Sequence, residues 1–300
     1  MIKRTLYFGN DAYLHTTNKQ LVISFADRQK EDVRIPIEDI GVVILDAFRL
    51  TISQTLISKL LHNNVALITC DERHHPQGLM LNLEGNTLQQ ERFRYQINAS
   101  QPLKKNLWQQ TIKAKIRNQS ALLDIHGFDT ENMHYWETQV ASGDPKNYEG
   151  RAAAYYWKNL FNDYQEGFVR GRFEAEPNNL LNYGYAILRA VVARSLVASG
   201  LLPTLGIHHH NRYNAYALAD DIMEPYRPYV DRLVLEIMLK YDSISELTPE
   251  LKKELLQIPV IDIYIDGQKS PLMVGLQQTT ASLAASYEGG IRKIKYPELG

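Results

Sequence analysis

The sequence predicts an α+β protein, in which a small β-rich N-terminal domain precedes a larger, mostly α-helical C-terminal domain. Short stretches in which apolar and polar residues alternate dominate the first ninety residues, and turn residues separate them. From about Gln90, apolar residues instead recur at the three- and four-residue spacing of amphipathic helices. We therefore expect a β-rich domain over residues 1–90 and an α-helical domain over residues 91–300.

The N-terminal domain is expected to contain several short strands and one helix. The strand-like stretches are residues 4–26, 33–46, 65–72 and 78–83. Pro36 has no backbone N–H to donate, so it favours a sheet edge or the start of a strand. Residues 51–64 carry apolar side chains at helical spacing, with Thr51 as the expected cap and Asn63-Asn64 as the stop signal.

The C-terminal domain is expected to be almost entirely helical. The helix-like stretches are residues 91–123, 150–161, 178–200, 227–241 and 248–258. We interpret the break in the first of these, at 99–102, as the linker between the domains. Residues 259–272 predict a β-hairpin that turns at Asp266-Gly267, and the basic tail 288–300 is expected to be mobile.

The composition is that of an ordinary soluble globular protein, with 44% hydrophobic and 22% charged residues. No apolar run approaches the roughly 18 residues that cross a bilayer, so no membrane association is expected. The N-terminus lacks the apolar core of a signal peptide, which favours the cytoplasm. The single cysteine, Cys70, leaves no internal disulfide and no cysteine-based zinc framework. The net charge of −1 still allows nucleic-acid binding, because one face can be basic while another is acidic.

Residues 206–228, GIHHHNRYNAYALADDIMEPYRP, bring histidines and acids close together in sequence. Asp221 and Glu224 are three residues apart and Asp220 and Glu224 are four apart, so either pair can share a helix face. Pro225 is expected to kink the helix beside Glu224. A solvated acidic face and a metal site are both compatible with this pattern.

The histidine triplet His208–His210 follows the helix-ending residues Gly200 and Pro203, so it belongs to a loop or to the start of the next helix. By itself the triplet is equally compatible with an exposed polar loop. An imidazole close to several carboxylates suits a divalent cation, and two or more carboxylates favour Mg²⁺ or Mn²⁺ over zinc.

Two further groups stand upstream of the triplet. Glu149 lies at the start of a predicted helix whose next turn has only small residues, which leaves room for a ligand. Its spacing alone favours an ordinary helix-start charge that stabilises the helix dipole. Asn182 and Tyr183 belong to a polar cluster at the start of another helix, where they either cap that helix or brace the metal-site residues.

Taken together, these segments resemble the first and most widespread family of CRISPR-associated proteins, the integrases that capture new spacers. The resemblance covers most of the chain and rests on the order and spacing of several motifs. These motifs are Tyr148–Ala153, Asn178–Leu188, Gly206–His209, Asp221–Glu224 and Tyr226–Pro228. The sequences of the histidine loop and of Leu107–Gln119 are similar to those of the type II branch of the family.

The resemblance implies a Mg²⁺ or Mn²⁺ site held by Glu149, His209 and Glu224, which would be the catalytic residues. A shift of the loop by one residue would make His208 or His210 the ligand instead. Asp221 is implied as a supporting acid. Arg227, one helical turn after Glu224, and the pair Asn182 and Tyr183 are expected to support the site as well.

The implied activity is metal-dependent DNA integration and endonuclease cleavage, in which a 3′-hydroxyl attacks a phosphodiester at a CRISPR repeat. The implied partners are spacer and repeat DNA, a second copy of the chain joined through the N-terminal domain, the small ferredoxin-like second CRISPR-associated protein, and the type II effector nuclease. The candidate DNA contacts are Lys104, Lys105, Lys113, Lys115, Arg117, Arg170, Arg172, Arg227 and Arg292. Two alternatives are an inactive DNA-binding scaffold of the same fold and an unrelated zinc hydrolase that uses the histidine triplet.

Overall fold

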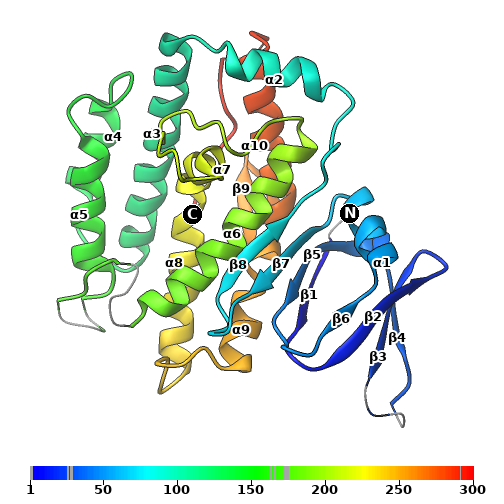
Figure 1. Cartoon of the computed structure of the whole chain (residues 1–300). Coiled ribbons are helices and arrows are strands. Elements are labelled where there is room, and N and C mark those ends of the chain that lie inside the picture. Colours follow the sequence, from blue (N-terminus) through cyan, green and yellow to red (C-terminus); the bar gives the residue numbers. More distant parts are fainter. Residues whose placement is uncertain are drawn as a thin grey trace. The chain divides into compact units, whose positions relative to one another are not determined.

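The computed structural model describes residues 3–25, 27, 30–162, 164, 167–171, 176–290 and 292–300. The chain divides into two compact units, Met1–Thr87 and Leu88–Gly300. Strands dominate the first unit and helices the second (Figure 1), which confirms the predicted α+β class.

The first unit contains two four-stranded sheets. One has the order β1 (Arg4–Phe8), β5 (Ile40–Leu45), β7 (Ala66–Cys70) and β8 (Pro76–Met80). Its first three strands are parallel, and β8 runs antiparallel to β7. The other has the order β4 (Val33–Pro36), β3 (Gln20–Phe25), β2 (Ala12–Thr17) and β6 (Thr51–Ile52). Pro36 thus lies in an edge strand, as predicted, and a short 3₁₀ turn, η1 (Ile37–Asp39), follows it.

Among the described residues of this unit, α1 (Gln54–His62) is the one α-helix, and it buries Leu56 and Leu60 in the core of the unit. The predicted cap at Thr51 is wrong, because Thr51 belongs to β6. The side chain of Ser53 accepts the capping hydrogen bond from Leu56 N at 3.3 Å. The predicted stop is confirmed, since Asn63 follows the last helical residue and Asn64 has a φ of 56°.

The second unit consists of helices and one hairpin. Its elements are α2 (Gln89–Ile97), α3 (Gln101–Ile125), α4 (Glu131–Gln139), α5 (Tyr148–Leu160), α6 (Asn178–Ala198), α7 (Ala217–Met223), η2 (Glu224–Tyr226), α8 (Arg227–Lys240), α9 (Pro249–Leu255), η3 (Ile258–Val260), β9 (Asp262–Ile265), β10 (Gln268–Pro271) and α10 (Leu272–Tyr287). The long helix α3 packs against α4, α5, η2 and α8 (Figure 1). Segments that are far apart in the sequence therefore meet on α3.

Two predictions about this unit are wrong. The break at 99–102 separates α2 from α3 inside the second unit, where the side chain of Ser100 caps α3 by accepting from Leu103 N. The described tail residues 292–300 pack on the unit, because Leu299 is buried and its N–H donates to Asn118 Oδ1 at 3.1 Å. The hairpin is confirmed, with its turn at Asp266-Gly267.

Helix α4 was not expected, because its sequence ENMHYWETQ has no regular apolar stripe. Among the helices that the structure describes, none combines the length and the apolar character that a bilayer crossing requires.

Candidate functional site

The first acid of the site, Glu149, lies in the first turn of α5. The Asp144 carboxylate accepts hydrogen bonds from the backbone N–H groups of Tyr148 and Glu149, at 3.0 and 2.9 Å. Asn147 caps the same turn by accepting from Gly150 N at 3.1 Å. These bonds satisfy the free N–H groups of the helix end, so the backbone at Glu149 is held while its side chain remains free to reach a partner.

The second acid, Glu224, lies where α7 passes into the 3₁₀ turn η2. Pro225 lacks the N–H that would continue an α-helix, and this tighter turn interrupts the α-helix at the predicted place. Asn118 of α3 donates to the carbonyl oxygen of Pro225 at 2.7 Å, which fastens the turn to α3. Glu224 is only 7% exposed, and its Oε1 accepts from Arg227 Nε at 2.8 Å.

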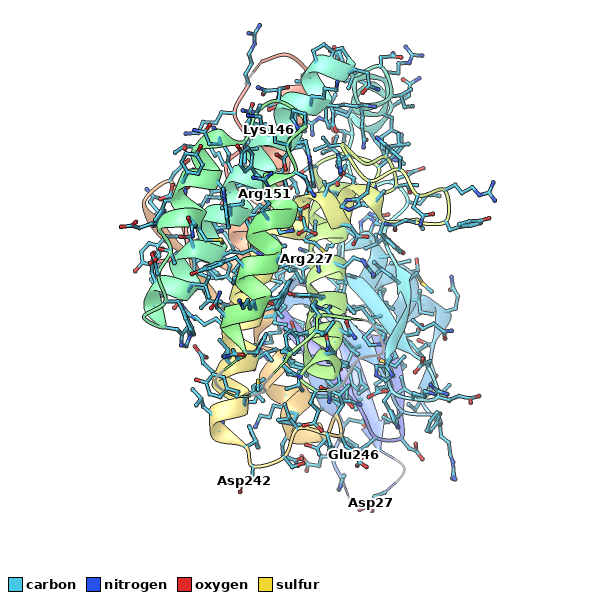
Figure 2. The ribbon with its side chains drawn as sticks, turned by 90° about the vertical axis from the view of Figure 1, so that its left-hand side faces the viewer. Asp27, Lys146, Arg151, Arg227, Asp242 and Glu246 are labelled. Carbon is cyan, nitrogen blue, oxygen red and sulfur yellow. The ribbon has the colours of Figure 1, made fainter. Side chains whose placement is uncertain are left out.

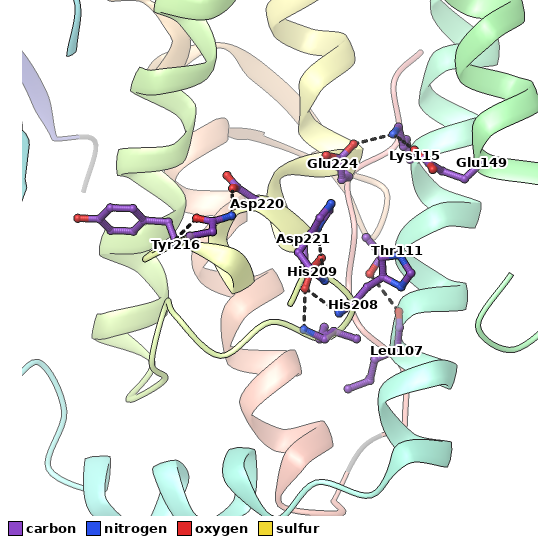
Figure 3. Close-up of polar contacts among 12 residues, drawn as sticks. Leu107, Thr111, Lys115, Glu149, His208, His209, Tyr216, Asp220, Asp221 and Glu224 are labelled. Carbon is purple, nitrogen blue, oxygen red and sulfur yellow. Dashed lines mark hydrogen bonds and ion pairs between the residues drawn. The ribbon is translucent and has the colours of Figure 1, made fainter. Parts of the chain in front are cut away.

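An ammonium group joins the two acids (Figure 3). Lys115 Nζ of α3 lies 2.5 Å from Glu149 Oε1 and 2.7 Å from Glu224 Oε2. Burial disfavours the charged ammonium, but attraction to Glu224 and Glu149 outweighs it and raises the pKa of Lys115. Burial also opposes the charge on Glu224, yet Arg227 and Lys115 lower the pKa of that carboxyl to about 2. Glu224 and Lys115 are therefore ionised at neutral pH.

Arg227 is held by more than Glu224. Its guanidinium lies 4.5 Å from the ring centroid of Tyr185, and Arg170 lies 5.1 Å from the same centroid. Asn182 Oδ1 accepts from Arg170 at 2.8 Å, which links Asn182 to the acid site through Arg170 and Tyr185. Tyr183 is fully buried, and Lys252 Nζ lies 5.9 Å from its ring centroid.

The histidine loop folds around the carboxylate of Asp221, which is fully buried. Asp221 Oδ2 accepts from Ile207 N at 2.6 Å and from His208 N at 3.0 Å. Asp221 Oδ1 accepts from His209 N at 3.3 Å and lies 2.6 Å from His209 Nδ1. A Cβ at Gly206 would lie 2.3 Å from the carbonyl oxygen of His209, so this turn of the loop requires glycine.

Asp221 also sets the role of His209. A carboxylate oxygen accepts here, so the neutral His209 ring carries its proton on Nδ1 and keeps a lone pair on Nε2. The His209 side chain is 45% exposed, and the hydrogen bond to Asp221 raises its pKa. His208 instead stacks on Trp108, with ring centroids 4.1 Å apart and planes 3° apart. The geometry thus favours His209 over His208 as a ligand, and it gives Asp221 a supporting role.

The donors have the chemistry of a Mg²⁺ or Mn²⁺ site, since two carboxylates converge on one cationic point and one imidazole is oriented for coordination. Among the residues that the structure describes, however, no group of three His, Cys, Asp or Glu side chains is arranged to hold a metal ion. The place between Glu149 and Glu224 is taken by Lys115. A divalent cation could bind these two carboxylates only if it displaced Lys115 from them.

Sequence reasoning treated Lys115 only as a candidate DNA contact and did not single out Trp108. The two are seven residues apart and lie on one face of α3, and both are buried, which is unusual for a lysine. Two exposed cations close to Glu149 in sequence, Lys146 and Arg151, were not among the candidate DNA contacts. Figure 2 labels Lys146 and Arg151 together with Arg227 on the side of the second unit that it turns to the viewer.

Not every predicted contact can be placed. Arg172, one of the candidate DNA contacts, lies outside the described residues. Arg117 forms ion pairs with Glu137 and Glu298, at 2.6 and 3.7 Å.

Residues 6–247 match the family model of the CRISPR associated protein Cas1. The chain belongs to the Cas1 family. It is 35% identical to the CRISPR-associated endonuclease Cas1 of Neisseria meningitidis serogroup C, over 100% of this chain and 97% of that protein. It is 26% identical to a Cas1 endonuclease of Francisella tularensis subsp. novicida, over 92% of this chain and 93% of that protein. The predicted family is therefore confirmed.

Solved structures show the same fold. A casposase bound to its integration product superposes with a TM-score of 0.80 and 20% identity, covering 98% of this chain and 92% of that one. A Cas1 protein from Thermotoga maritima gives a TM-score of 0.75 and 15% identity, covering 95% and 97%. Both units of this chain thus have the architecture of Cas1 proteins.

Proposed function

We propose that this Cas1 family member is a metal-dependent DNA integrase and endonuclease that inserts captured DNA into a CRISPR repeat array. In the proposed reaction, a DNA 3′-hydroxyl attacks a phosphodiester, one P–O bond forms, and another breaks to release a new 3′-hydroxyl. With water as the nucleophile the same site cleaves DNA. The names of its relatives support this proposal, because they are Cas1 endonucleases and a casposase bound to an integration product.

One observation carries the proposal. Glu149 and Glu224 come from separate elements, α5 and η2. Each of them places one carboxylate oxygen within 2.7 Å of the same cation, Lys115 Nζ. Acids that are brought together from distant parts of a chain repel one another, so their convergence favours a site for positive charge over two unrelated surface charges.

The residues that would hold a Mg²⁺ or Mn²⁺ ion are Glu149, His209 and Glu224. When bound, such an ion would withdraw charge from the phosphate and from the leaving oxygen. Arg227 keeps Glu224 ionised and in place through the bond to Oε1. Asp221 holds the proton of the neutral His209 ring on Nδ1, which leaves the lone pair of Nε2 available to a metal ion. This arrangement supplies alignment and charge neutralisation, which phosphoryl transfer chiefly needs.

The proposed partners are spacer and repeat DNA, a second copy of this chain, the small second CRISPR-associated protein, and a type II effector nuclease. A chain of a Cas6-RT-Cas1–Cas2 complex shares the fold at a TM-score of 0.75. The cytoplasm is the proposed location.

The test is integration of a DNA fragment into a plasmid that bears the repeat, with the partner protein and with or without Mg²⁺. We expect Mg²⁺-dependent half-site products from the wild type. Glu149→Gln and Glu224→Gln should lower their yield by at least about a hundredfold, because each replaces a charged oxygen ligand. Glu250→Gln, an exposed acid at the start of α9, is the matched control and should integrate normally.

The inactive-scaffold alternative makes the opposite prediction. It requires that the wild type bind DNA but yield no product with either Mg²⁺ or Mn²⁺. Full activity of both glutamine variants would refute the site and leave only the family membership.

A further inference from the structure

The place between the two glutamates already holds a cation that belongs to the chain. Lys115 Nζ contacts Glu149 Oε1 and Glu224 Oε2, and the Lys115 side chain is only 9% exposed. The remaining oxygen of Glu224 accepts from Arg227. A divalent cation that binds these carboxylates must therefore take oxygens from Lys115.

The charges around this place nearly cancel. Two carboxylates, Glu149 and Glu224, face two cations, Lys115 and Arg227. Arg227 is also stacked on Tyr185, and this second contact holds it in place when a metal ion binds. In the part of the chain that the structure describes, Lys115 has no such second anchor, since its polar partners are the two acids. The lysine is thus the movable cation of the site.

A buried ammonium that loses both acceptors is unstable unless another anion replaces them. The substrate of the proposed function supplies such an anion, because every DNA linkage carries a charged phosphate. Exposed cations at the start of α5, Lys146 and Arg151, lie in sequence on either side of Glu149 and favour the approach of DNA to this end of the helix.

We propose that Lys115 couples metal binding to DNA binding: it holds Glu149 and Glu224 together while DNA is absent, and it transfers to a DNA phosphate when a divalent metal takes the two carboxylates. The inference rests on the proposed function. The free protein then binds the metal weakly, and DNA strengthens metal binding because it receives the displaced lysine. By linkage, the metal strengthens DNA binding by the same factor.

The test is Mn²⁺ binding, followed by the electron paramagnetic resonance signal of free Mn²⁺, with the full-length protein. Each protein is titrated alone and with a duplex ending in 3′-dideoxynucleotides, which has no attacking hydroxyl. The variants are Lys115→Met and Lys115→Gln, the second of which keeps a hydrogen-bond donor in case the first fails to fold. Lys253→Met, at an exposed lysine of α9, controls for the loss of one positive charge, and Glu149→Gln shows which Mn²⁺ signal belongs to this site.

We expect both Lys115 variants to bind Mn²⁺ about tenfold more tightly than the wild type when DNA is absent. The strengthening of Mn²⁺ binding by DNA should shrink by a similar factor, within the range of ordinary allosteric couplings. Lys253→Met should match the wild type in both measurements. A lysine that merely braced the acids would have the reverse effect, because its removal would leave Mn²⁺ binding weaker.

Variants of Lys115 that bind Mn²⁺ no more tightly than the wild type overturn the coupling. If the wild type nevertheless integrates DNA, the proposed function stands without it. If the variants bind Mn²⁺ more tightly but the wild type does not integrate, the coupling stands and the proposed function falls. If none of the proteins shows an Mn²⁺ signal that depends on Glu149, both the coupling and the proposed function are overturned.

Discussion

Replacing Asp221 with asparagine tests how one carboxylate builds the histidine loop. Asp221 receives four contacts, two on each oxygen: Ile207 N and His208 N on Oδ2, and His209 N and Nδ1 on Oδ1. Asparagine has a nearly identical shape but only one acceptor oxygen. Its NH₂ group must therefore face one of these two pairs of donors.

Each orientation of the new amide has its own cost. If the NH₂ faces Ile207 and His208, two backbone N–H groups lose their acceptor, the first in a buried contact and the second in a partly buried one. Each such loss costs about 1–3 kcal/mol, so we expect a destabilisation of about 3 kcal/mol in total. If the NH₂ faces His209, it donates to Nδ1 and moves the ring proton to Nε2, which removes the lone pair that a metal needs. Mn²⁺ affinity should then fall about 10- to 100-fold.

Chemical denaturation measures the first effect and Mn²⁺ titration the second. Asp220→Asn is the matched control, because Asp220 adjoins Asp221 but bonds Arg189 and Asn214 instead, at 2.6 and 2.8 Å. We expect it to lose about 1 kcal/mol and to keep its Mn²⁺ affinity. An Asp221→Asn protein that differs from the wild type by less than about 0.5 kcal/mol and binds Mn²⁺ equally well would refute the reasoning.

Three further predictions follow from neighbouring contacts. Gly206→Ala should destabilise the protein by more than about 2 kcal/mol in thermal or chemical unfolding, because its Cβ meets the backbone oxygen of His209; an unchanged unfolding midpoint would contradict this. His208→Ala should keep integration within about tenfold of the wild type, since His208 stacks on Trp108, whereas His209→Ala should abolish it; the reverse ranking would move the ligand to His208. Burial raises the pKa of Asp231 from 3.8 to about 6 despite its bonds to tyrosine hydroxyls. The folded state therefore keeps this proton up to a higher pH than the unfolded state does. The stability of the wild type relative to Asp231→Asn should therefore be highest below pH 4 and fall by up to about 3 kcal/mol as the pH rises through 6; a pH-independent difference in urea unfolding would argue against the shift.

The sequence predicted the fold class because periodicity is a local property. Alternation in the first ninety residues and helical spacing afterwards both survive in the structure, as does the hairpin turn at Asp266-Gly267. Errors arose where a tertiary contact decides the outcome. The break at 99–102 has the composition of a linker but is a capped junction between α2 and α3. The tail is basic, like many mobile tails, but Asn118 and buried apolar contacts hold it.

The same distinction between local sequence pattern and tertiary contact applies to the candidate site. Order and spacing of motifs were sufficient to predict the family and to nominate Glu149, His209 and Glu224, whose roles remain predictions. Spacing could not choose among the three histidines, because a loop has no fixed period; the bond between Asp221 and His209 Nδ1 distinguishes them. Nor could spacing find Lys115, since a lysine in a helix is usually solvated. Only the packing of α3 against α5 and η2 places its ammonium between two distant carboxylates, where burial and charge make it part of the site.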